Sequence, residues 1–457
     1  MKHYDLVILG GGRASGLAIA AAKEGKSVAL VERDRLGGTC PNTGCVPSKL
    51  LIGYAEAARR VREADRHFIK ATLEEIDVAR IFQEVGDWVQ GVDPRYESRM
   101  EGVDLYRGHG RFVSNKVVEV NGEELAGEVI VVATGTKPRP TPFADVWTNE
   151  NLFPLKEKVP RSITVVGGGF IGCELANFFE AVGIETRLLV RGETLLPIED
   201  EDIEAVFREE FTKNVPTSFG TTVAGLEKNE NGFLLDLTGP DGSTSRHQSE
   251  QVLFAIGRVP TTDNLGIENT DLQLDQRGYL VVDDSLRTNV DGIYAAGDIA
   301  GRYQLQHVAS YDIHYLRQQL LKGAEGPIDY GAVPHAVFTD PEIAAVGATE
   351  AELVEKGTPF VKIFQDWKAS ARAMASRLDY PRIKLLVSPD DYSILGCHLV
   401  GPDASTVLHE VLAIMRLKND VREMAAMMYI HPALPELLLD AAVQAIKEVK
   451  KYRRGVD

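Results

Sequence analysis

The sequence contains little cysteine, with 4 residues among 457. So few cysteines exclude a secreted scaffold held together by disulfides and favour the cytoplasm, where a disulfide serves catalysis more often than structure. No run of about 20 apolar residues is present, so no transmembrane helix is expected. The opening apolar stretch, residues 6–9, is too short for the hydrophobic core of a signal peptide.

Basic residues are in deficit, at 50 against 67 acidic residues, which gives a formal net charge of -17. Nucleic acids and anionic membranes bind basic surfaces, so neither is expected as a partner. The hydrophobic content of 44% is ordinary for a globular protein. A chain of 457 residues is too long for one hydrophobic core and predicts about two to four domains.

Two of the four cysteines lie close together, in the segment GGTCPNTGCVPSK at residues 37–49. A regular helix would separate Cys40 from Cys45 by about 7.5 Å along its axis. A disulfide requires Cα atoms within about 7 Å of each other. We therefore expect the chain to leave helical geometry between the two cysteines, and Pro41 and Gly44 suit that distortion.

A new helix is expected to begin around Pro47, which places Cys45 near a helix N-terminus. The helix dipole stabilises a thiolate at that position, so a nucleophile or a charge donor is predicted there. The remaining cysteines, Cys173 and Cys397, are isolated in the sequence. A zinc site needs about four ligands, so no metal site is expected.

A dinucleotide-binding fingerprint opens the chain. An apolar strand at residues 4–9 runs into a glycine-rich turn and an alanine-rich helix, and the next strand ends at Glu32. Gly10 permits the tight turn, and Gly12 lets a pyrophosphate approach the backbone at the helix N-terminus. Ser15 occupies the place of the third glycine, where a small side chain still allows close packing. Glu32 is expected to accept hydrogen bonds from ribose hydroxyls.

A second fingerprint follows the strand that begins at residue 163. All three glycines of the template are present as Gly167, Gly169 and Gly172. The next strand ends in Arg191 rather than in an acidic residue. Arginine suits a ribose 2′-phosphate, which favours NADPH, but no second arginine follows closely, so NADH stays open.

The chain repeats its organisation. Each fingerprint is followed by turn-rich strands and then by a similar exit segment, at residues 128–138 and 251–260. Two dinucleotide modules in one chain imply electron transfer between two cofactors. From about residue 330 a third unit begins, with strand patterns at residues 333–338, 382–387 and 394–399, followed by long helix patterns.

The C-terminal region contains the segment HPALPE, with His431 and Glu436 at its ends. Cleavage of a disulfide requires protonation of a leaving thiolate, and the ordinary pKa of histidine suits that task. A carboxylate five residues away can hold one ring nitrogen and leave the other free. We therefore predict that His431 is an acid–base catalyst oriented by Glu436.

These motifs together resemble the flavoprotein disulfide reductases, which include dihydrolipoyl dehydrogenase, glutathione reductase and mycothione reductase. The resemblance covers nearly the whole chain and includes the segment TNVDGIYAAGD at residues 288–298. It implies an α/β fold with two Rossmann-like domains, for FAD and NAD(P), and an α+β C-terminal domain that forms a homodimer. The implied boundaries are 1–145 and 263–330 for the FAD domain, 146–262 for the NAD(P) domain and 331–457 for the dimerisation domain.

The resemblance also implies a function for individual residues. Cys40 would attack the substrate disulfide and Cys45 would contact the flavin. Lys49 and Glu174 would form a buried pair beside the flavin, and His431 would serve the cysteines of the opposite chain. The implied FAD residues are Gly10, Gly12, Ser15, Glu32, Gly38, Thr39, Lys49, Ala133, Thr134, Gly135, Gly297, Asp298 and His307. The implied NAD(P) residues are Gly167, Gly169, Phe170, Ile171, Gly172, Glu174, Arg191 and Gly257, with Phe170 as an aromatic gate over the nicotinamide.

The substrate is expected to be a small disulfide or dithiol. The interior of the 431–436 segment and Arg191 favour a mycothione-type reductase, and dihydrolipoyl dehydrogenase is the alternative. The chain ends without an extra cysteine pair, which argues against mercuric reductase and large thioredoxin reductase. A flavoprotein that binds FAD without turnover is the alternative from another class.

Overall fold

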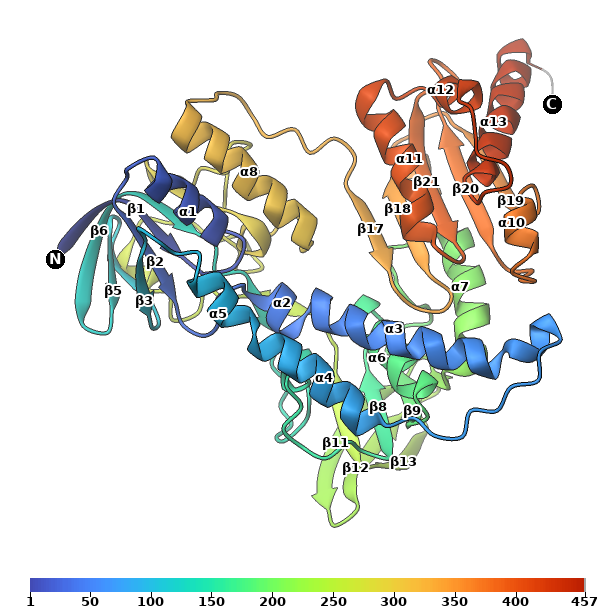
Figure 1. The fold of residues 1–457 in the computed structure, drawn as a ribbon, viewed down its shortest axis with the longest axis horizontal. Helices are drawn as coiled ribbons and strands as arrows, with labels where there is room; N and C mark the ends of the chain where they lie inside the picture. Colours follow the sequence, from blue (N-terminus) through green and yellow to red (C-terminus); the bar gives the residue numbers. More distant parts are fainter. Residues whose placement is uncertain (456–457) are drawn as a thin grey trace. The chain divides into compact units, whose positions relative to one another are not determined.

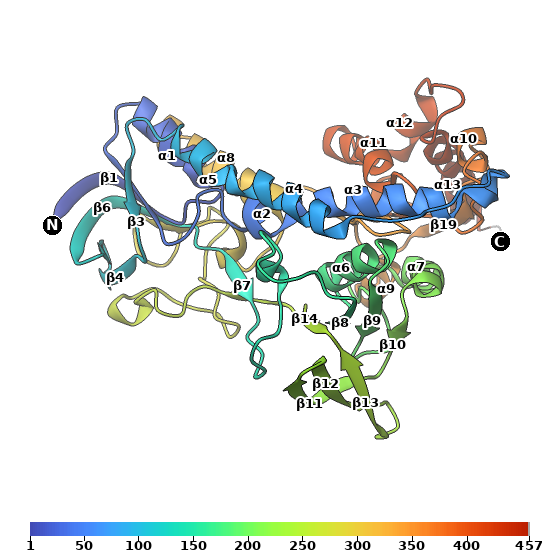
Figure 2. The ribbon, with the colours of Figure 1, turned by 60° about the horizontal axis from the view of Figure 1, so that its bottom comes forward.

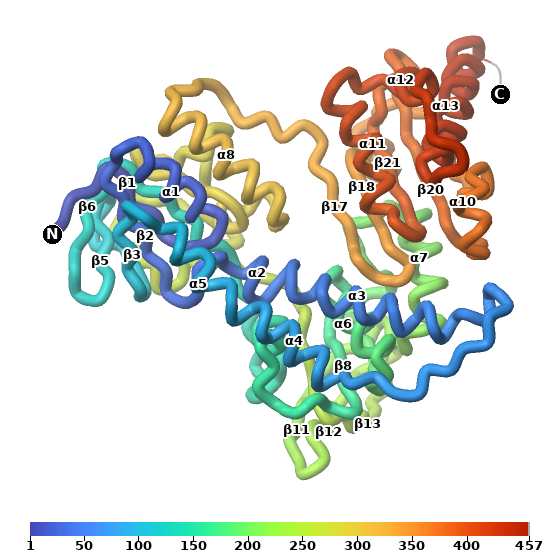
Figure 3. Tube along the Cα trace, in the orientation of Figure 1, coloured from blue at the N-terminus to red at the C-terminus, as the bar shows by residue number. Residues whose placement is uncertain are grey.

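The computed structural model describes residues 1–455. Contacts divide the chain into two compact units. The first, unit 1, contains Met1–Leu51, Val78–Val159 and Ile256–Asp329. The second, unit 2, contains Ile52–Asp77, Pro160–Ala255 and the described chain from Tyr330 onward. The colours of Figure 3 show that unit 1 is assembled from three separate segments, in blue, cyan to teal, and yellow.

Unit 1 is built on a seven-stranded sheet in the order β3-β2-β1-β6-β5-β4, with β16 paired to β6. Its parallel part aligns Leu6 with Val28 and Ile8 with Val131. The strands are β1 (Lys2–Leu9), β2 (Val28–Glu32), β3 (Asp104–Arg107), β4 (Arg111–Ser114), β5 (Val117–Val120), β6 (Glu123–Val132) and β16 (Ile293–Ala295). The parallel strand β2 is apolar except at its last residue, Glu32, and is buried on both faces. Val7 and Ile130 in the middle of the sheet are fully buried.

Helices cover this sheet, and α1 (Ser15–Lys23) packs against α8 (Gln306–Lys322), as Figure 1 shows. The other helices are α2 (Thr39–Thr43), α3 (Cys45–Arg62), which continues into unit 2, α4 (Val78–Gln90) and α5 (Val92–Glu97). A two-stranded ribbon pairs β7 (Thr136–Pro138) with β15 (Arg258–Pro260). Three 3-10 turns complete the unit: η2 (Asn149–Asn151), η3 (Ile267–Asn269) and η4 (Gly297–Ala300).

Unit 2 contains a second parallel sheet in the order β10-β9-β8-β14. Figure 2 shows an antiparallel sheet, β11-β12-β13, beside it. The parallel strands are β8 (Ser162–Val166), β9 (Glu185–Leu189), β10 (Thr217–Ser218) and β14 (Gln251–Phe254), with helices α6 (Phe170–Ala181) and α7 (Glu201–Asn214). The antiparallel strands are β11 (Thr222–Asn229), β12 (Gly232–Thr238) and β13 (Thr244–Ser249), and η1 (Ala64–His67) follows α3.

The C-terminal part of unit 2 is an antiparallel sheet in the order β17-β18-β21-β20-β19. Its strands are β17 (Pro334–Val337), β18 (Ile343–Gly347), β19 (Val361–Asp366), β20 (Arg382–Val387) and β21 (Ile394–Val400). Its helices are α9 (Glu350–Glu355), α10 (Ala371–Met374), α11 (Ala404–Leu417), α12 (Val421–Ala426) and α13 (Glu436–Arg454). The three strands expected here and the α+β architecture are confirmed, and two further strands, β18 and β19, are present.

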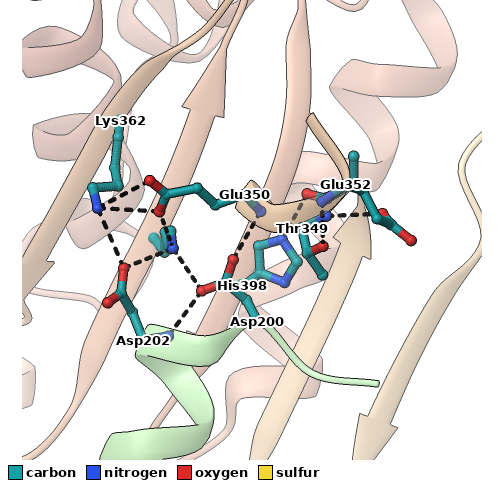
Figure 4. A network of polar contacts seen from close by, with 9 residues as sticks. Asp200, Asp202, Thr349, Glu350, Glu352, Lys362 and His398 are labelled. Atoms are coloured by element: carbon teal, nitrogen blue, oxygen red, sulfur yellow. Dashed lines mark hydrogen bonds and ion pairs between the residues drawn. The ribbon is translucent and has the colours of Figure 1, made fainter. Parts of the chain in front are cut away.

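A buried ion network joins α7 to this C-terminal sheet (Figure 4). The Lys384 ammonium lies 2.6 Å from both Asp200 Oδ1 and Asp202 Oδ2. It also lies 2.5 Å from Glu350 Oε2, and Lys362 contacts the same carboxylate at 3.1 Å. Lys384 and Asp200 are each only 1% exposed. Burial of these charges is tolerable because each of them has an opposite charge beside it.

Candidate active site

The two neighbouring cysteines lie at a break between two helices. Helix α2 ends at Thr43, Gly44 has φ -130° and ψ -121°, and α3 begins at Cys45. A Cβ on Gly44 would lie 3.0 Å from the Thr39 carbonyl oxygen, so a side chain there would crowd the turn. The predicted departure from helical geometry between Cys40 and Cys45 is confirmed. Cys45 stands at the start of α3, where the helix dipole favours negative charge.

Both cysteines are free thiols in this structure, with Cys40 half-buried and Cys45 exposed. The pKa of Cys40 is raised, first by its hydrogen bond to Cys45 and then by burial. The charge of Arg13 and a hydrogen bond from the Val46 backbone act in the opposite direction. Since the two thiols are hydrogen-bonded to each other, their side chains are within reach for a bond between the sulfurs.

The first glycine turn leaves no room for a side chain at Gly10. Gly10 has φ +107°, and a Cβ there would lie 2.3 Å from the Ala133 carbonyl oxygen. Ser15 replaces the third glycine and donates a buried hydrogen bond from Oγ to the Gly11 carbonyl at 2.8 Å. Gly16 has open space around it and therefore does not substitute for the third glycine.

Glu32 is held in place at the end of β2. Its carboxylate accepts hydrogen bonds from the Gly11 and Asp34 backbone N–H groups, at 2.7 and 2.8 Å. Burial raises the pKa of Glu32, although these two hydrogen bonds act against that rise. An oriented carboxylate beside the glycine turn is suited to accept hydrogen bonds from a ribose.

A pocket opens at the carboxyl ends of β1 and β2. Three predicted FAD residues, Gly10, Glu32 and Thr134, line it. The other lining residues were not predicted: Leu9, Val31, Arg33, Gly108, His109, Gly110, Thr261 and Leu265. The glycine backbone at the start of α1, the carboxylate and this pocket fit a dinucleotide such as FAD.

The redox segment touches the glycine turn. The Gly37 backbone donates a hydrogen bond to the Gly11 carbonyl at 2.8 Å. Gly38 has φ +69°, and a Cβ there would lie 2.9 Å from the Gly12 Cα. Asn42 Nδ2 donates to the Gly38 carbonyl at 2.9 Å and so fixes the segment from its other side. The glycine turn that is predicted to hold the nucleotide therefore lies next to the segment that carries the cysteine pair.

The other residues predicted to bind FAD, around Ala133–Gly135 and Gly297–Asp298, lie in unit 1 together with the first glycine turn. Thr136 Oγ1 donates a hydrogen bond to Asp298 Oδ2 at 2.8 Å, and burial raises the pKa of Asp298. Asp312 Oδ2 accepts a hydrogen bond from the Gly297 backbone at 2.8 Å. The predicted residues Ala133, Thr134 and Gly135 follow β6, Thr39 begins α2, and His307 is the second residue of α8. Thr261 Oγ1, which was not predicted, contacts the Thr134 and Gly135 carbonyl oxygens at 2.9 and 3.0 Å.

The second glycine turn in unit 2 is tighter than the first. Gly167 has φ +122°, and a Cβ on Gly172 would lie only 1.9 Å from the Gly167 carbonyl oxygen. Gly169 caps α6, which begins at Phe170, and the Phe170 side chain is 43% exposed. Phe170 is therefore accessible at the start of α6, and its function as a gate over the nicotinamide stays a prediction.

The other residues predicted to bind the nicotinamide nucleotide lie on separate elements and are not all in unit 2. Glu174 is buried on α6, as is its neighbour Cys173, and Glu174 Oε1 accepts a hydrogen bond from the Phe338 backbone at 3.0 Å. Arg191 is exposed just after β9. Ile171 lies on α6, whereas Gly257 lies in unit 1. Lys49 belongs to unit 1 and Glu174 to unit 2, so their pairing stays a prediction.

His431 and Glu436 form the predicted pair. The ring Nδ1 lies 2.7 Å from Glu436 Oε1, and Glu436 Oε2 accepts a hydrogen bond from the Ala433 backbone at 2.9 Å. The hydrogen bond from His431, followed by that from Ala433, lowers the pKa of Glu436. The His431 side chain is 78% exposed. The carboxylate therefore holds one ring nitrogen and leaves Nε2 facing solvent.

Comparison with known proteins identifies the family. Residues 4–312 match pyridine nucleotide-disulphide oxidoreductase, and residues 333–442 match the dimerisation domain of the same family. The chain belongs to the pyridine nucleotide-disulphide oxidoreductase family. Its two matches cover both nucleotide-binding modules and most of the C-terminal sheet and helices, so the predicted family and fold class are confirmed.

Relatives of this oxidoreductase align over nearly its whole length. It is 32% identical to a dihydrolipoyl dehydrogenase of Haloferax volcanii, over 97% of this chain and 96% of the relative. The dihydrolipoyl dehydrogenase of Thermus scotoductus is 31% identical, over 97% of each chain. The solved Cu(II) complex of the HOCl-induced flavoprotein disulfide reductase RclA from Escherichia coli aligns with a TM-score of 0.86 and 27% identity, over 97% of this chain and 100% of that one. LpdA from Mycobacterium tuberculosis aligns with a TM-score of 0.85 and 27% identity, over 97% and 99%.

This member of the family is an FAD-dependent disulfide oxidoreductase that uses NAD(P)H. The relatives named above favour the predicted alternative, dihydrolipoyl dehydrogenase, over the preferred mycothione-type reductase. In the part of the chain that the structure describes, no group of three or more His, Cys, Asp or Glu side chains is placed to hold a metal ion. Across residues 1–455, no helix combines the length and hydropathy required to cross a membrane.

Proposed function

We propose that this enzyme oxidises a small dithiol of the dihydrolipoyl type and passes the electrons to a nicotinamide nucleotide. The observation that carries the proposal is the hydrogen-bonded pair Cys40 and Cys45, in a segment that touches the first glycine turn. Relatives named dihydrolipoyl dehydrogenase, at 30 to 32% identity over nearly the full chain, support the choice of substrate. Bound FAD supplies the two-electron acceptor between the dithiol and the nicotinamide.

The chain's own residues carry out the sulfur chemistry. One substrate thiolate attacks Cys40 Sγ of the Cys40–Cys45 disulfide, and Cys45 leaves as a thiolate that the start of α3 stabilises. The second substrate thiolate then attacks the sulfur bound to Cys40, which closes the substrate disulfide and releases Cys40. His431 takes up one substrate proton at each attack through its free nitrogen and releases the first to solvent before it takes up the second, while Glu436 holds the ring. The same steps in reverse reduce a disulfide.

We propose the following cofactor residues. The segments 1–145 and 263–330 bind FAD through the glycine turn, Glu32 and Asp298. The segment 146–262 binds the nicotinamide nucleotide through Gly167, Gly169 and Gly172, with Phe170 over the nicotinamide. The remaining residues predicted for each cofactor belong to the same proposal, including the Lys49 and Glu174 pair beside the flavin.

The third segment, 331–457, is proposed to form a homodimer in which His431 serves the opposite chain. The match to a dimerisation domain supports this proposal. So do the exposed apolar side chains of Met428 and Ile430, at 99% and 81%, next to His431. Large apolar side chains that are this exposed and lie two residues apart are suited to burial against a partner. We place the enzyme in the cytoplasm because a catalytic disulfide must be able to return to its dithiol form.

A second candidate function is NADPH-dependent reduction of a low-molecular-weight disulfide, of which mycothione is one type. Arg191 favours it, because an exposed arginine after β9 suits the 2′-phosphate of NADPH. The two candidates are separated by kcat/KM for dihydrolipoamide with NAD⁺ and NADP⁺, against mycothiol disulfide and glutathione disulfide with NADH and NADPH. The dihydrolipoyl proposal requires dihydrolipoamide to rank first, and a higher value for a thiol disulfide with NADPH would replace it with the second candidate.

A further inference from the structure

We propose that Tyr429 is a positioning residue for His431 and that its hydroxyl fixes the start of the His431 loop to α11. The His431 loop is the segment of residues 427–435, between α12 and α13. The inference deepens the proposed function and rests on it for the assignment of His431 as the acid–base catalyst. It identifies what fixes the backbone of the loop, whereas Glu436 orients the ring of His431.

The side chains in the first half of the loop point in two directions. Met428 and Ile430 are 99% and 81% exposed, and the His431 side chain is 78% exposed. Tyr429 lies between the two exposed apolar residues, yet it is half-buried. Its side chain therefore points back to its own chain and is placed to fix this otherwise exposed stretch.

The Tyr429 hydroxyl reaches two helices. Its oxygen lies 2.5 Å from Glu410 Oε1 on α11 and 3.1 Å from the Met424 carbonyl oxygen on α12. A phenol has one hydrogen to donate, and the shorter distance assigns this hydrogen to the carboxylate. Hydrogen bonds to a carboxylate are among the stronger ones in proteins, so removal of the hydroxyl should free the start of the loop.

The second half of the loop has an anchor of its own. Ser370, which is fully buried, donates a hydrogen bond from Oγ to the Ala433 carbonyl oxygen at 2.8 Å. His431 therefore lies between two fixed points, with Tyr429 two residues before it and Ala433 two residues after it. A displacement of about 1 Å can slow a reaction between positioned groups by about a hundredfold. Release of one anchor should therefore impair proton transfer by His431.

A double-mutant cycle between Tyr429 and His431 tests the inference. Tyr429→Phe removes the hydroxyl but keeps the ring, and it should lower kcat by roughly tenfold. The assay uses the holoenzyme and the compound with the highest kcat/KM in the panel of dithiols and disulfides. In the His431→Gln background, Tyr429→Phe should change kcat by less than about twofold, because no catalyst is left to position. A general structural defect would lower kcat by the same factor in both backgrounds.

Further variants control for the hydrogen bond and for the loss of a hydroxyl. Glu410→Gln keeps an oxygen that accepts the hydrogen bond and should retain most of kcat, whereas Glu410→Ala should behave like Tyr429→Phe. Tyr452→Phe changes a tyrosine of α13 that is 54% exposed and should leave kcat unchanged. Reduction of ferricyanide by NAD(P)H should be unchanged in every variant, because this acceptor takes single electrons and no proton.

The outcomes separate the inference from the proposed function. Equal factors of loss from Tyr429→Phe in the two backgrounds overturn the inference, and so does a normal kcat in the single variant. Dissociation of Tyr429→Phe into monomers at the assay concentration also overturns it, since the hydroxyl would then support the interface. A near-normal kcat in His431→Gln refutes the acid–base assignment in the proposed function. The compound that ranks first in the panel tests the proposed substrate and does not affect the inference about Tyr429.

Discussion

Removal of the buried lysine ammonium should destabilise unit 2 strongly. In Lys384→Met, the apolar side chain occupies similar volume but leaves its carboxylate partners unpaired. The unpaired Asp200 carboxylate should cause most of the loss of stability, because it is 1% exposed. Asp202 and Glu350 are 37% and 29% exposed and keep contact with water. Two backbone N–H groups, from Asp202 and Glu350, still donate hydrogen bonds to the Asp200 carboxylate, at 3.1 and 3.0 Å. These bonds reduce the loss in the free energy of unfolding.

Breaking a buried pair by removing one partner costs about 3–5 kcal/mol. We expect the lower end, about 3 kcal/mol, because of these remaining hydrogen bonds. The double variant Lys384→Met with Asp200→Asn should recover part of the loss, since no buried charge then lacks a partner. Lys362→Met is the matched control: this ammonium is 40% exposed, so its loss should cost less than about 1 kcal/mol.

Urea unfolding followed by tryptophan fluorescence measures these differences. Trp367 is 2% exposed and belongs to the hydrophobic core beside β20, so its emission reports on the affected region. The reasoning is refuted if Lys384→Met unfolds within about 1 kcal/mol of Lys362→Met. It is also refuted if Asp200→Asn, added to Lys384→Met, lowers the free energy of unfolding further instead of raising it.

Three other predictions follow from single contacts. His431→Gln should slow turnover by about 10²- to 10⁴-fold in kcat, because the acid–base group is lost while the cysteines remain. Gly172→Ala should weaken nicotinamide nucleotide binding, measured as Kd, by at least about tenfold, since its Cβ would lie 1.9 Å from the Gly167 carbonyl oxygen and the turn must shift. The pKa of His335 is raised above 6.5: burial is the largest single effect and lowers the pKa, but the hydrogen bond to Glu199 and the negative charge of that carboxylate together outweigh it. Its contribution to stability is therefore present below about pH 6.5 and is lost as the pH rises through the higher folded-state pKa, which urea unfolding at several pH values will detect.

Each of these predictions has a control and a contrary outcome. His409→Gln alters an exposed histidine on α11 and should leave kcat unchanged, and a near-normal rate for His431→Gln would end its assignment as catalyst. Gly53→Ala, in open space on α3, should leave nucleotide binding intact, and equal Kd values for it and Gly172→Ala would contradict the steric argument. The His335 argument fails if His335→Gln shows the same pH dependence as the wild type.

The features predicted well from the sequence are those that depend on local chemistry. The break between Cys40 and Cys45 follows from the residue types inside it, and the hydrogen bond from His431 to Glu436 follows from a spacing of five residues. Three strands of the C-terminal sheet, β17, β20 and β21, were predicted to within one residue of their observed bounds. Each of these features is determined by residues within one short segment.

The features that were missed depend on contacts between distant segments. Strand β18 is short and rich in small residues, and β19 contains the charged residues Lys362 and Asp366, so neither shows a strong pattern alone. Lys384 lies in an apolar strand, and its carboxylate partners are far away in sequence. Gly108, His109 and Gly110 line the pocket at the carboxyl ends of β1 and β2 because β3 pairs in parallel with β2. That pairing was the one signal that could have identified them, since carboxyl ends of parallel strands share one edge.

The central claim is that Cys40 and Cys45 alternate between disulfide and dithiol next to the bound flavin. It is tested most directly by anaerobic reductive titration of the oxidised holoenzyme, with dithionite as the reductant and bound FAD as the reference. The account predicts that the wild type takes up twice as many electrons per FAD as Cys40→Ser, because a disulfide accepts one further electron pair. The claim would be contradicted if the wild type and Cys40→Ser took up the same number of electrons per FAD.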